Sequence, residues 1–357
     1  MKRFNKLVAL LAAMLMVFSL AACGNNSKST VSSDTGESTD SAQSNEDAAS
    51  TEEASTPSDD LIVVGFSQVG AESDWRTANT ESMKSTFSEA NGYQLIFDDA
   101  QQKQENQIKA VRNFIQQDVD YIVIAPVTET GWDTVLQEAK EAGIPVIIVD
   151  RMIDVSDDSL FTAWVGSNFL QEGYNAVEWL AGYLDSKGRA DEQVNIVTLQ
   201  GTIGSSAQIG RTDGFAEKMK AYPNWTMLEK QTGEFTQSKG QEVMESFLKS
   251  YDDIDVVIAE NDNMAFGAID AIQAAGKTCG PEGDIIIVSF DAVAAAFDAM
   301  IAGTMNVSVE CNPLHGPRVA EIIQKLEGGE TVDKLQYVEE GVFPAETAAE
   351  IKPTRAY

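Results

Sequence analysis

The chain of 357 residues contains one histidine, His315, and three cysteines, at positions 23, 279 and 311. A single histidine gives little basis for a serine–histidine nucleophile or a histidine-ligated metal. We therefore expect no catalytic residue, no metal and no cofactor. Three widely separated cysteines do not make a disulfide framework, and the sequence leaves open whether Cys279 and Cys311 pair.

Basic residues are also scarce, with 25 Lys and Arg against 56 Asp and Glu and a net charge of −31. Because phosphate backbones are bound by basic surfaces, we expect no nucleic-acid partner. Nucleotide-binding loops are missing as well. No G-x-G-x-x-G follows the first expected strand, and the Gly- and Ser-containing run 201–206 has no G-K-[ST].

Long apolar runs are missing after residue 22, so no transmembrane segment is expected there. The run 7–22 follows a basic start and is typical of a secretory signal peptide, 1–22. It ends in Leu20-Ala21-Ala22-Cys23, which resembles the bacterial lipobox. We expect cleavage before Cys23 and lipid on its thiol; the alternative is an ordinary signal peptide with a chance cysteine. Residues 23–60 are then a lipidated cysteine and a disordered acidic linker without aromatics.

One pattern occurs twice in the rest of the chain. The apolar segment 146–149 ends in Asp150-Arg151, and the similar segment 284–290 ends in Asp291. The segments one unit upstream, 118–126 and 253–261, also match. Runs of β-branched residues are typical of parallel strands covered on both faces. The repeat predicts an α/β fold with two Rossmann-like lobes, and a ligand cleft at the carboxyl ends of the strands.

The periodicity of apolar residues, together with the residues that favour turns, predicts the individual strands and helices. Strands are expected at 61–66, 95–97, 121–125, 146–151, 162–165, 194–199, about 227–232, 255–259 and 285–290, with 307–310 returning towards the first lobe and 337–342 as one late strand. Helices are expected at 75–90, 101–117, 132–142, 169–183, 207–220, 238–250, 264–275, 293–302 and 313–327.

Charged residues at strand and helix ends are the main candidates for ligand binding. The carboxylate of Asp150 can accept hydrogen bonds from two sugar hydroxyls, while the planar guanidinium of Arg151 donates. The alternative is that Asp150 and Arg151 form a solvated ion pair. Arg211 stands near a helix N-terminus, where a base opposes the helix dipole, which favours function. Asn261 and Asp291 either bind ligand or cap the helices that follow them.

Aromatic and hinge residues complete the candidate set. Trp75 offers a flat face for a sugar ring with Phe235 as the opposite wall, although Trp75 equally suits a core. Glu310 ends a strand near a lobe crossing. His315 is expected to pack at the surface or hinge rather than act as a base.

Longer stretches carry a resemblance to a known family: residues 64–70, 73–76, 101–112, 124–126, 149–151, 199–202, 234–240 and 261–262. They resemble the type I periplasmic sugar-binding proteins of ABC importers, above all their galactofuranose-binding branch. The resemblance covers about residues 61–357. It implies three crossovers between an N-terminal lobe (61–166 and 312–338) and a C-terminal lobe (167–311 and 339–357). It also implies a ligand site formed by Ser67, Trp75, Arg76, Asp150, Arg151, Arg211, Phe235, Asn261, Asp291 and Glu310.

The expected function is capture of a monosaccharide for ABC transporter permease subunits. We expect a monomer held by its lipid at the extracellular face of the cell membrane. The pair Trp75-Arg76 favours a furanose with an exocyclic arm, such as galactofuranose, fructofuranose or arabinofuranose. The alternatives are a sensor domain that presents sugar to a membrane signalling receptor, and a glycosidase. The glycosidase is disfavoured because arginines beside the acids are expected to keep them ionised.

Overall fold

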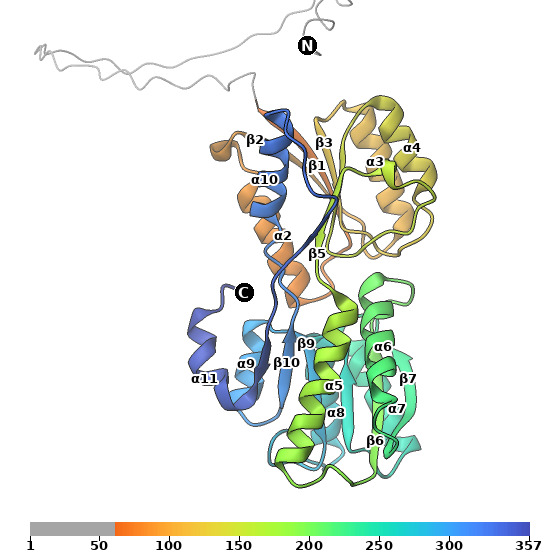
Figure 1. Cartoon of the computed structure of the whole chain (residues 1–357), viewed down its shortest axis with the longest axis vertical. Helices are drawn as coiled ribbons and strands as arrows, with labels where there is room; N and C mark the ends of the chain where they lie inside the picture. Colours follow the sequence, from red (N-terminus) through yellow and green to blue (C-terminus); the bar gives the residue numbers. More distant parts are fainter. Residues whose placement is uncertain (1–60) are drawn as a thin grey trace, which may run out of the picture. The chain divides into compact units, whose positions relative to one another are not determined.

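The computed structural model describes residues 61–357; the expected signal peptide, Cys23 and the linker lie outside the described residues. The described chain contains two six-stranded sheets (Figure 1). The first has the order β11-β5-β4-β3-β1-β2, and all of its strand pairs are parallel. Its strands are β1 (Ile62–Gln68), β2 (Tyr93–Asp99), β3 (Tyr121–Ile124), β4 (Val146–Val149), β5 (Ala163–Gly166) and β11 (Leu335–Tyr337).

The second sheet has the order β12-β10-β9-β8-β6-β7, which repeats the topology of the first. Only its edge strand β12 is antiparallel to its neighbour. Its strands are β6 (Val194–Gln200), β7 (Trp225–Thr232), β8 (Val256–Ala259), β9 (Ile286–Asp291), β10 (Val307–Glu310) and β12 (Val342–Pro344). The segments that matched in the sequence occupy equivalent places, β3 with β8 and β4 with β9, so the predicted two-lobed α/β fold is confirmed.

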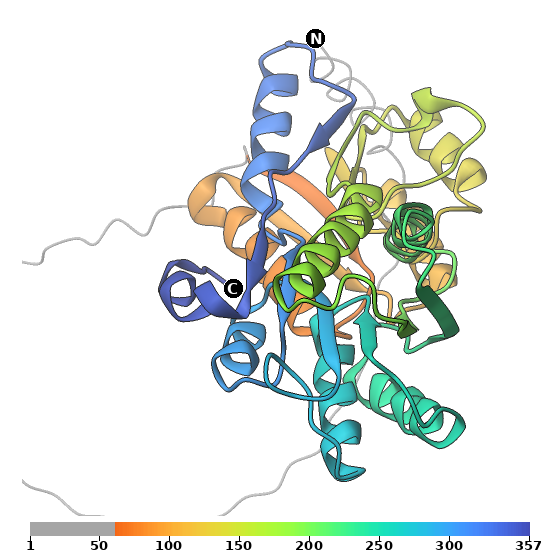
Figure 2. The same ribbon diagram turned by 60° about the horizontal axis from the view of Figure 1, so that its bottom comes forward.

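Helices cover both faces of each sheet (Figures 1 and 2). In the N-lobe, Val123 faces the layer of α2 and α10, whereas Ile122 and Ile124 face the layer of α3 and α4. This period of two on a fully buried strand explains the continuous apolar runs in the sequence. The N-lobe helices are α2 (Asp74–Thr86), α3 (Gln104–Gln116), α4 (Asp133–Ala142) and α10 (Gly316–Glu327).

In the C-lobe, α5 and α6 pack side by side on one face, and α7 and α8 on the other (Figure 2). The C-lobe helices are α5 (Phe169–Ser186), α6 (Ser206–Met219), α7 (Gln237–Ser250), α8 (Asp262–Ala274), α9 (Ala294–Ile301) and α11 (Ala348–Ile351). Short 3-10 helices are η2 (Glu89–Asn91), η3 (Asp158–Leu160), η4 (Ala345–Thr347) and η5 (Lys352–Thr354). No helix among residues 61–357 is both long and apolar enough to cross a bilayer.

The chain passes between the sheets at three crossovers, residues 167–168, 311–315 and 338–341. The expectation of one late strand over 337–342 is wrong. The third crossover divides this segment into β11 in the first sheet and β12 in the second. The strand expected at 307–310 is β10, which pairs with β9 and β12 in the second sheet and leads into the second crossover. The division of 337–342 was not visible in the sequence, because an alternating apolar pattern does not say which sheet a strand joins.

Candidate functional site

A cavity of about 290 Å³ lies between the two lobes, at the carboxyl ends of central strands. Asp150 follows β4 and Asp291 ends β9, so equivalent strands place one acid in each lobe. The residues that line the cavity are Glu72, Ser73, Trp75, Arg76, Asp150, Arg151, Phe169, Ala207, Arg211, Phe235, Asn261, Asp291 and Cys311.

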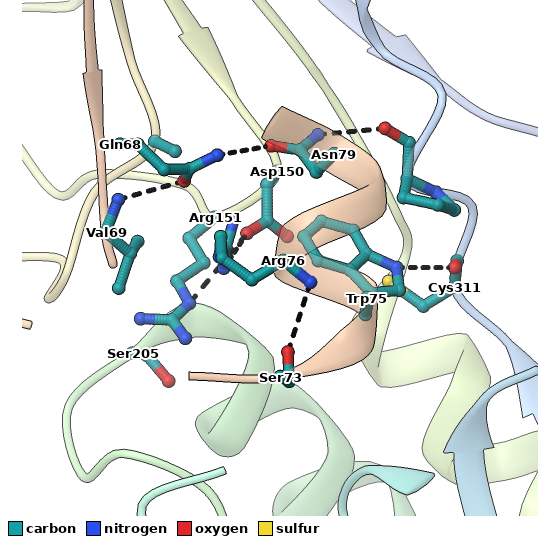
Figure 3. A network of polar contacts seen from close by, with 12 residues as sticks. Gln68, Val69, Ser73, Trp75, Arg76, Asn79, Asp150, Arg151, Ser205 and Cys311 are labelled. Atoms are coloured by element: carbon teal, nitrogen blue, oxygen red, sulfur yellow. Dashed lines mark hydrogen bonds and ion pairs between the residues drawn. The ribbon is translucent and has the colours of Figure 1, made fainter. Parts of the chain in front are cut away.

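Two arginines and two acids form the N-lobe wall of the cavity. Arg76 donates from Nη2 to Asp150 over 2.8 Å and from Nε to Glu72 over 2.9 Å. Arg151 donates to the Val127 carbonyl, and its Nη2 lies 3.9 Å from Glu72. The Arg151 Nε lies 3.9 Å from Asp150 (Figure 3). All four side chains are at most 4% exposed. The wall is therefore a buried network in which two positive and two negative charges balance.

The C-lobe wall is formed by Arg211 and Asp291, and a second acid, Glu172, contacts Arg211 without lining the cavity. Arg211 donates from Nε to Glu172 over 2.6 Å and from Nη1 to the Glu260 carbonyl. Its Nη2 lies 3.6 Å from Asp291. These contacts explain why a base is stable in the second turn of α6, since buried acids outweigh the unfavourable helix dipole.

Burial controls protonation on the C-lobe wall. Burial raises the pKa of Asp291 well above its usual value, against the opposing effect of Arg211. Burial likewise raises the pKa of Glu172, and Arg211 again opposes it. Burial therefore opposes the effect of the arginines that were expected to keep the site acids ionised, and one guanidinium serves several buried acids here.

Two aromatic side chains contribute apolar surface to the cavity. Trp75 lies on α2 and donates from Nε1 to the Cys311 carbonyl over 2.7 Å (Figure 3). Phe235 precedes α7, and the Arg151 guanidinium lies 5.1 Å from its ring centre. An indole whose N–H is satisfied elsewhere and a phenyl ring both leave apolar faces for a ligand.

Three residues at the cavity have left-handed backbones. The φ angles are 62° at Asp150, 61° at Phe235 and 109° at Asp291. Such conformations are costly for residues other than glycine and cluster where function requires them. They direct the chain away from the end of the preceding strand, so that the side chains line the cavity.

The structure brings eight of the ten predicted site residues to the cavity, namely Trp75, Arg76, Asp150, Arg151, Arg211, Phe235, Asn261 and Asp291. Asn261 both lines the cavity and caps α8, by accepting from Met264 N over 2.9 Å. The two proposed roles of Asn261 are therefore compatible. Asp291 does not cap α9, whose N-cap Val293 makes no side-chain hydrogen bond.

Ser67 and Glu310 are not among the residues that line the cavity. Ser67 is fully buried inside β1. Glu310 accepts from the backbone of Gly341 over 2.9 Å and from the Tyr357 hydroxyl over 2.8 Å, and it pairs with Arg355 over 2.7 Å. Its carboxylate is therefore used to attach the C-terminal segment to β10.

The sequence analysis missed the contribution of Glu72. Its Oε1 accepts from Arg76, four residues later, but its Oε2 is buried without a hydrogen-bond partner among the described residues. Arg76 Nη1 is unpaired in the same sense. A buried donor and acceptor of this kind are costly unless a ligand satisfies them. The sequence contained one signal for this contact, because Glu72 and Arg76 are four residues apart, a spacing that brings an acid and a base together on a helix.

The remaining candidates are structural. His315 is fully buried rather than at the surface, and its Nδ1 lies 3.2 Å from Asn79 Nδ2 at the second crossover. Burial lowers its pKa to about 4. Cys279 and Cys311 are both free and buried, which answers the question that the sequence left open.

Direct contacts join the lobes around the cavity. Asp74 N donates to Asn263 over 3.0 Å, and Met152 N donates to Ser206 Oγ over 2.8 Å. Glu129 N also donates to the Gly204 carbonyl over 3.0 Å. Bonds of this kind form only when the lobes approach, so the described state has its cleft closed.

Two repeated α/β lobes that enclose a polar cavity define a periplasmic binding protein fold. The chain belongs to this family: the model of the periplasmic binding protein domain matches residues 64–320. Family and relatives are binding proteins, which confirms the expectation that the chain is not an enzyme.

Particular relatives share more than the fold. The galactofuranose-binding protein YtfQ of Escherichia coli (strain K12) is 45% identical over 293 residues, which cover 81% of this chain and 90% of that protein. A Mycobacterium smegmatis protein solved with β-D-fucofuranose has a TM-score of 0.79 and 47% identity, over 83% of this chain and 96% of its own. The periplasmic binding component of the arabinose ABC transporter of Shewanella sp. ANA-3, bound to α- and β-L-arabinofuranose, has a TM-score of 0.76 and 48% identity, over 82% and 95%.

Proposed function

We propose that this protein captures a monosaccharide and delivers it to an ABC importer. The observation that carries the proposal is the cavity between the lobes, which combines two aromatic side chains with buried donors and acceptors from both lobes. A sensor role is not favoured, because the similar proteins described above are transport and sugar-binding proteins.

We further propose that the sugar is bound in a furanose form. Two similar solved structures contain furanoses. In this chain Arg76 lies over the Trp75 ring, with the guanidinium carbon 4.6 Å from the ring centre, and its Nη1 is free to donate. One aromatic face and a neighbouring donor suit a small ring with an exocyclic hydroxyl arm.

Calorimetric titration with galactose, fructose, arabinose, glucose and ribose tests both proposals. We expect affinity near micromolar, about −8 kcal/mol, for at least one furanose-forming sugar. NMR of the bound sugar should report a five-membered ring, and the sugar should be recovered intact after long incubation. Tight glucose binding without any response to furanose-forming sugars, or a bound pyranose, contradicts the furanose proposal.

The attachment to the membrane is a separate proposal. The lipobox-like run before Cys23 supports a lipid anchor at the extracellular face of the cell membrane. Cys23→Ser should release the protein into the medium while its sugar affinity stays unchanged. A Cys23→Ser variant that stays in the membrane fraction contradicts the anchor. Light scattering of the released protein tests the expected monomer.

A further inference from the structure

The three crossovers meet at a cluster of acidic and thiol side chains, of which only Cys311 also lines the sugar cavity. We call Glu172, Cys311 and Glu340 the hinge cluster. One carboxylate oxygen of each glutamate and the Cys311 Sγ all lie within 4.8 Å of one another. Cys311 belongs to the second crossover and Glu340 to the third, while Glu172 lies in the first turn of α5, just after the first.

Each member of the hinge cluster has a defined position. Glu340 Oε1 accepts from Ser167 Oγ over 2.5 Å and from Asn312 N over 2.7 Å, so it connects all three crossovers. Ser167 Oγ also lies 3.3 Å from the Cys311 Sγ. The cluster is therefore held by short contacts from several segments rather than by one flexible loop.

Glu172 supplies an independent indication of a ligand. The side chain is 2% exposed, and its Oε2 is occupied by Arg211. Its Oε1 has no hydrogen-bond partner among the described residues, although the carboxyl group interacts with the Cys311 thiol. Leaving a carboxylate oxygen buried and unpaired is unfavourable, and a cation at the hinge cluster would satisfy it.

The chemistry of the donors narrows the class of cation. Once a metal displaced their protons, the thiolate and the two carboxylates would carry −3 in total, and Arg211 contributes +1, so a divalent cation would balance the charge. A thiolate with oxygen ligands suits Zn²⁺, whereas Ca²⁺ and Mg²⁺ prefer oxygen alone. Tetrahedral Zn²⁺ with these bond lengths places its sulfur and oxygen ligands about 3.6 Å apart. Side chains already within 4.8 Å reach that spacing by small shifts.

We propose that the hinge cluster of Glu172, Cys311 and Glu340 binds a zinc-class divalent cation. The metal would join the second and third crossovers to α5. It would also lie directly behind the cavity, because the Cys311 carbonyl holds Trp75 and Glu172 holds Arg211. A cation at this place would restrict the hinge about which the lobes move. The sequence analysis expected no metal because the chain has a single histidine, and it did not consider these three ligands, which are far apart in the chain.

The test uses the full chain and titrates it with ZnCl₂ at moderate salt, which weakens binding by exposed acids. Cys279→Ser is the matched control, because Cys279 is also a free buried cysteine but is not in the hinge cluster. We expect one site per chain in the wild type and in Cys279→Ser. Cys311→Ser and, separately, Glu340→Gln should each weaken that site at least tenfold.

The spectrum of bound Co²⁺ reports which ligands hold the metal, rather than how tightly it is held. Wild type and Cys279→Ser should give the intense near-ultraviolet band of a cobalt–thiolate bond, and Cys311→Ser should lack it. If Cys311→Ser does not fold by circular dichroism, Glu340→Gln and the cobalt band of the wild type decide. Three results would overturn the proposal. The first is weak binding that salt abolishes, and the second is binding that Cys311→Ser and Glu340→Gln leave unchanged. The third is a cobalt spectrum without the thiolate band.

Discussion

Gly201 controls the position of one aromatic wall of the cavity, and Gly201→Ala tests it. This glycine follows β6, and a Cβ built on it would lie 1.9 Å from the Phe235 ring. Ordinary contact begins at 3.4 Å, so the ring would have to withdraw by about 1.5 Å. Because Phe235 lines the cavity, the ring moves away from Gly201 at the expense of the ligand's space.

The size of the effect follows from overpacking, which costs about 1–3 kcal/mol. If the free protein keeps its ring in place, folding bears the cost, and the melting temperature falls by about 2–5 °C. If the ring moves into the cavity, binding bears the cost, and Kd rises about 5- to 150-fold. The two losses have one source, so together they should amount to about 1–3 kcal/mol. Calorimetry and thermal unfolding on the same sample measure both.

Two further variants make the result specific. Gly182→Ala is the matched control, because Gly182 lies within α5 with nothing within 4 Å of the added Cβ. Alanine should stabilise that helix by about 0.5–1 kcal/mol and leave sugar affinity unchanged. In a Phe235→Ala background, Gly201→Ala should cost less than about 0.5 kcal/mol. The role assigned to the Phe235 ring is refuted if Gly201→Ala costs as much free energy in the Phe235→Ala background as in the wild type. It is also refuted if Gly201→Ala alone keeps wild-type affinity and stability.

Two other predictions test the charged walls. Asp150→Ala and Arg211→Ala should each weaken sugar binding by several kcal/mol, about 3, because each leaves a buried partner unpaired; wild-type affinity in titrations of both contradicts the site. Burial raises the pKa of Glu260 from 4.5 to about 7, so the folded state holds this proton more tightly than the unfolded state. The free energy of unfolding should therefore fall as pH rises from about 4.5 to 7, by about 3 kcal/mol from this group. Urea titrations of Glu260→Gln should lack that decrease and those of the exposed Glu245→Gln should retain it; a decrease that persists in Glu260→Gln excludes Glu260 as its source.

The repeat in the sequence was enough to predict the two lobes, because buried parallel strands have a continuous apolar pattern that survives without any knowledge of partners. The strand-end residues Asp150 and Asp291 were predictable for the same reason. Glu310 differs from these two residues, because β10 also ends near a lobe crossing but the C-terminal segment binds its carboxylate there. Nothing local in the sequence shows that this segment returns there.

Glu72 and the hinge cluster were missed for a different reason. Their environment is made by residues distant in the chain, such as Asp150 around Arg76 and Glu340 beside Cys311. A single sequence shows which residues end a strand but not which buried groups lack a partner. The unpaired atoms at Glu72 and Glu172 are properties of the folded structure alone.

The two lobes repeat one fold but provide different electrostatic surfaces to a ligand. Asp150 and Asp291 stand at equivalent strand ends with left-handed backbones. In the N-lobe, two arginines meet two acids, so each charge has an opposite partner within the wall. In the C-lobe, one Arg211 meets Glu172 and Asp291, and burial raises the pKa of both acids. A protonated carboxyl both donates and accepts, whereas an ionised carboxylate only accepts. The repeated fold thus presents a ligand with two arginines and two acids from the N-lobe and with Arg211 and Asp291 from the C-lobe, so the two sides of the cavity differ in their balance of donors and acceptors.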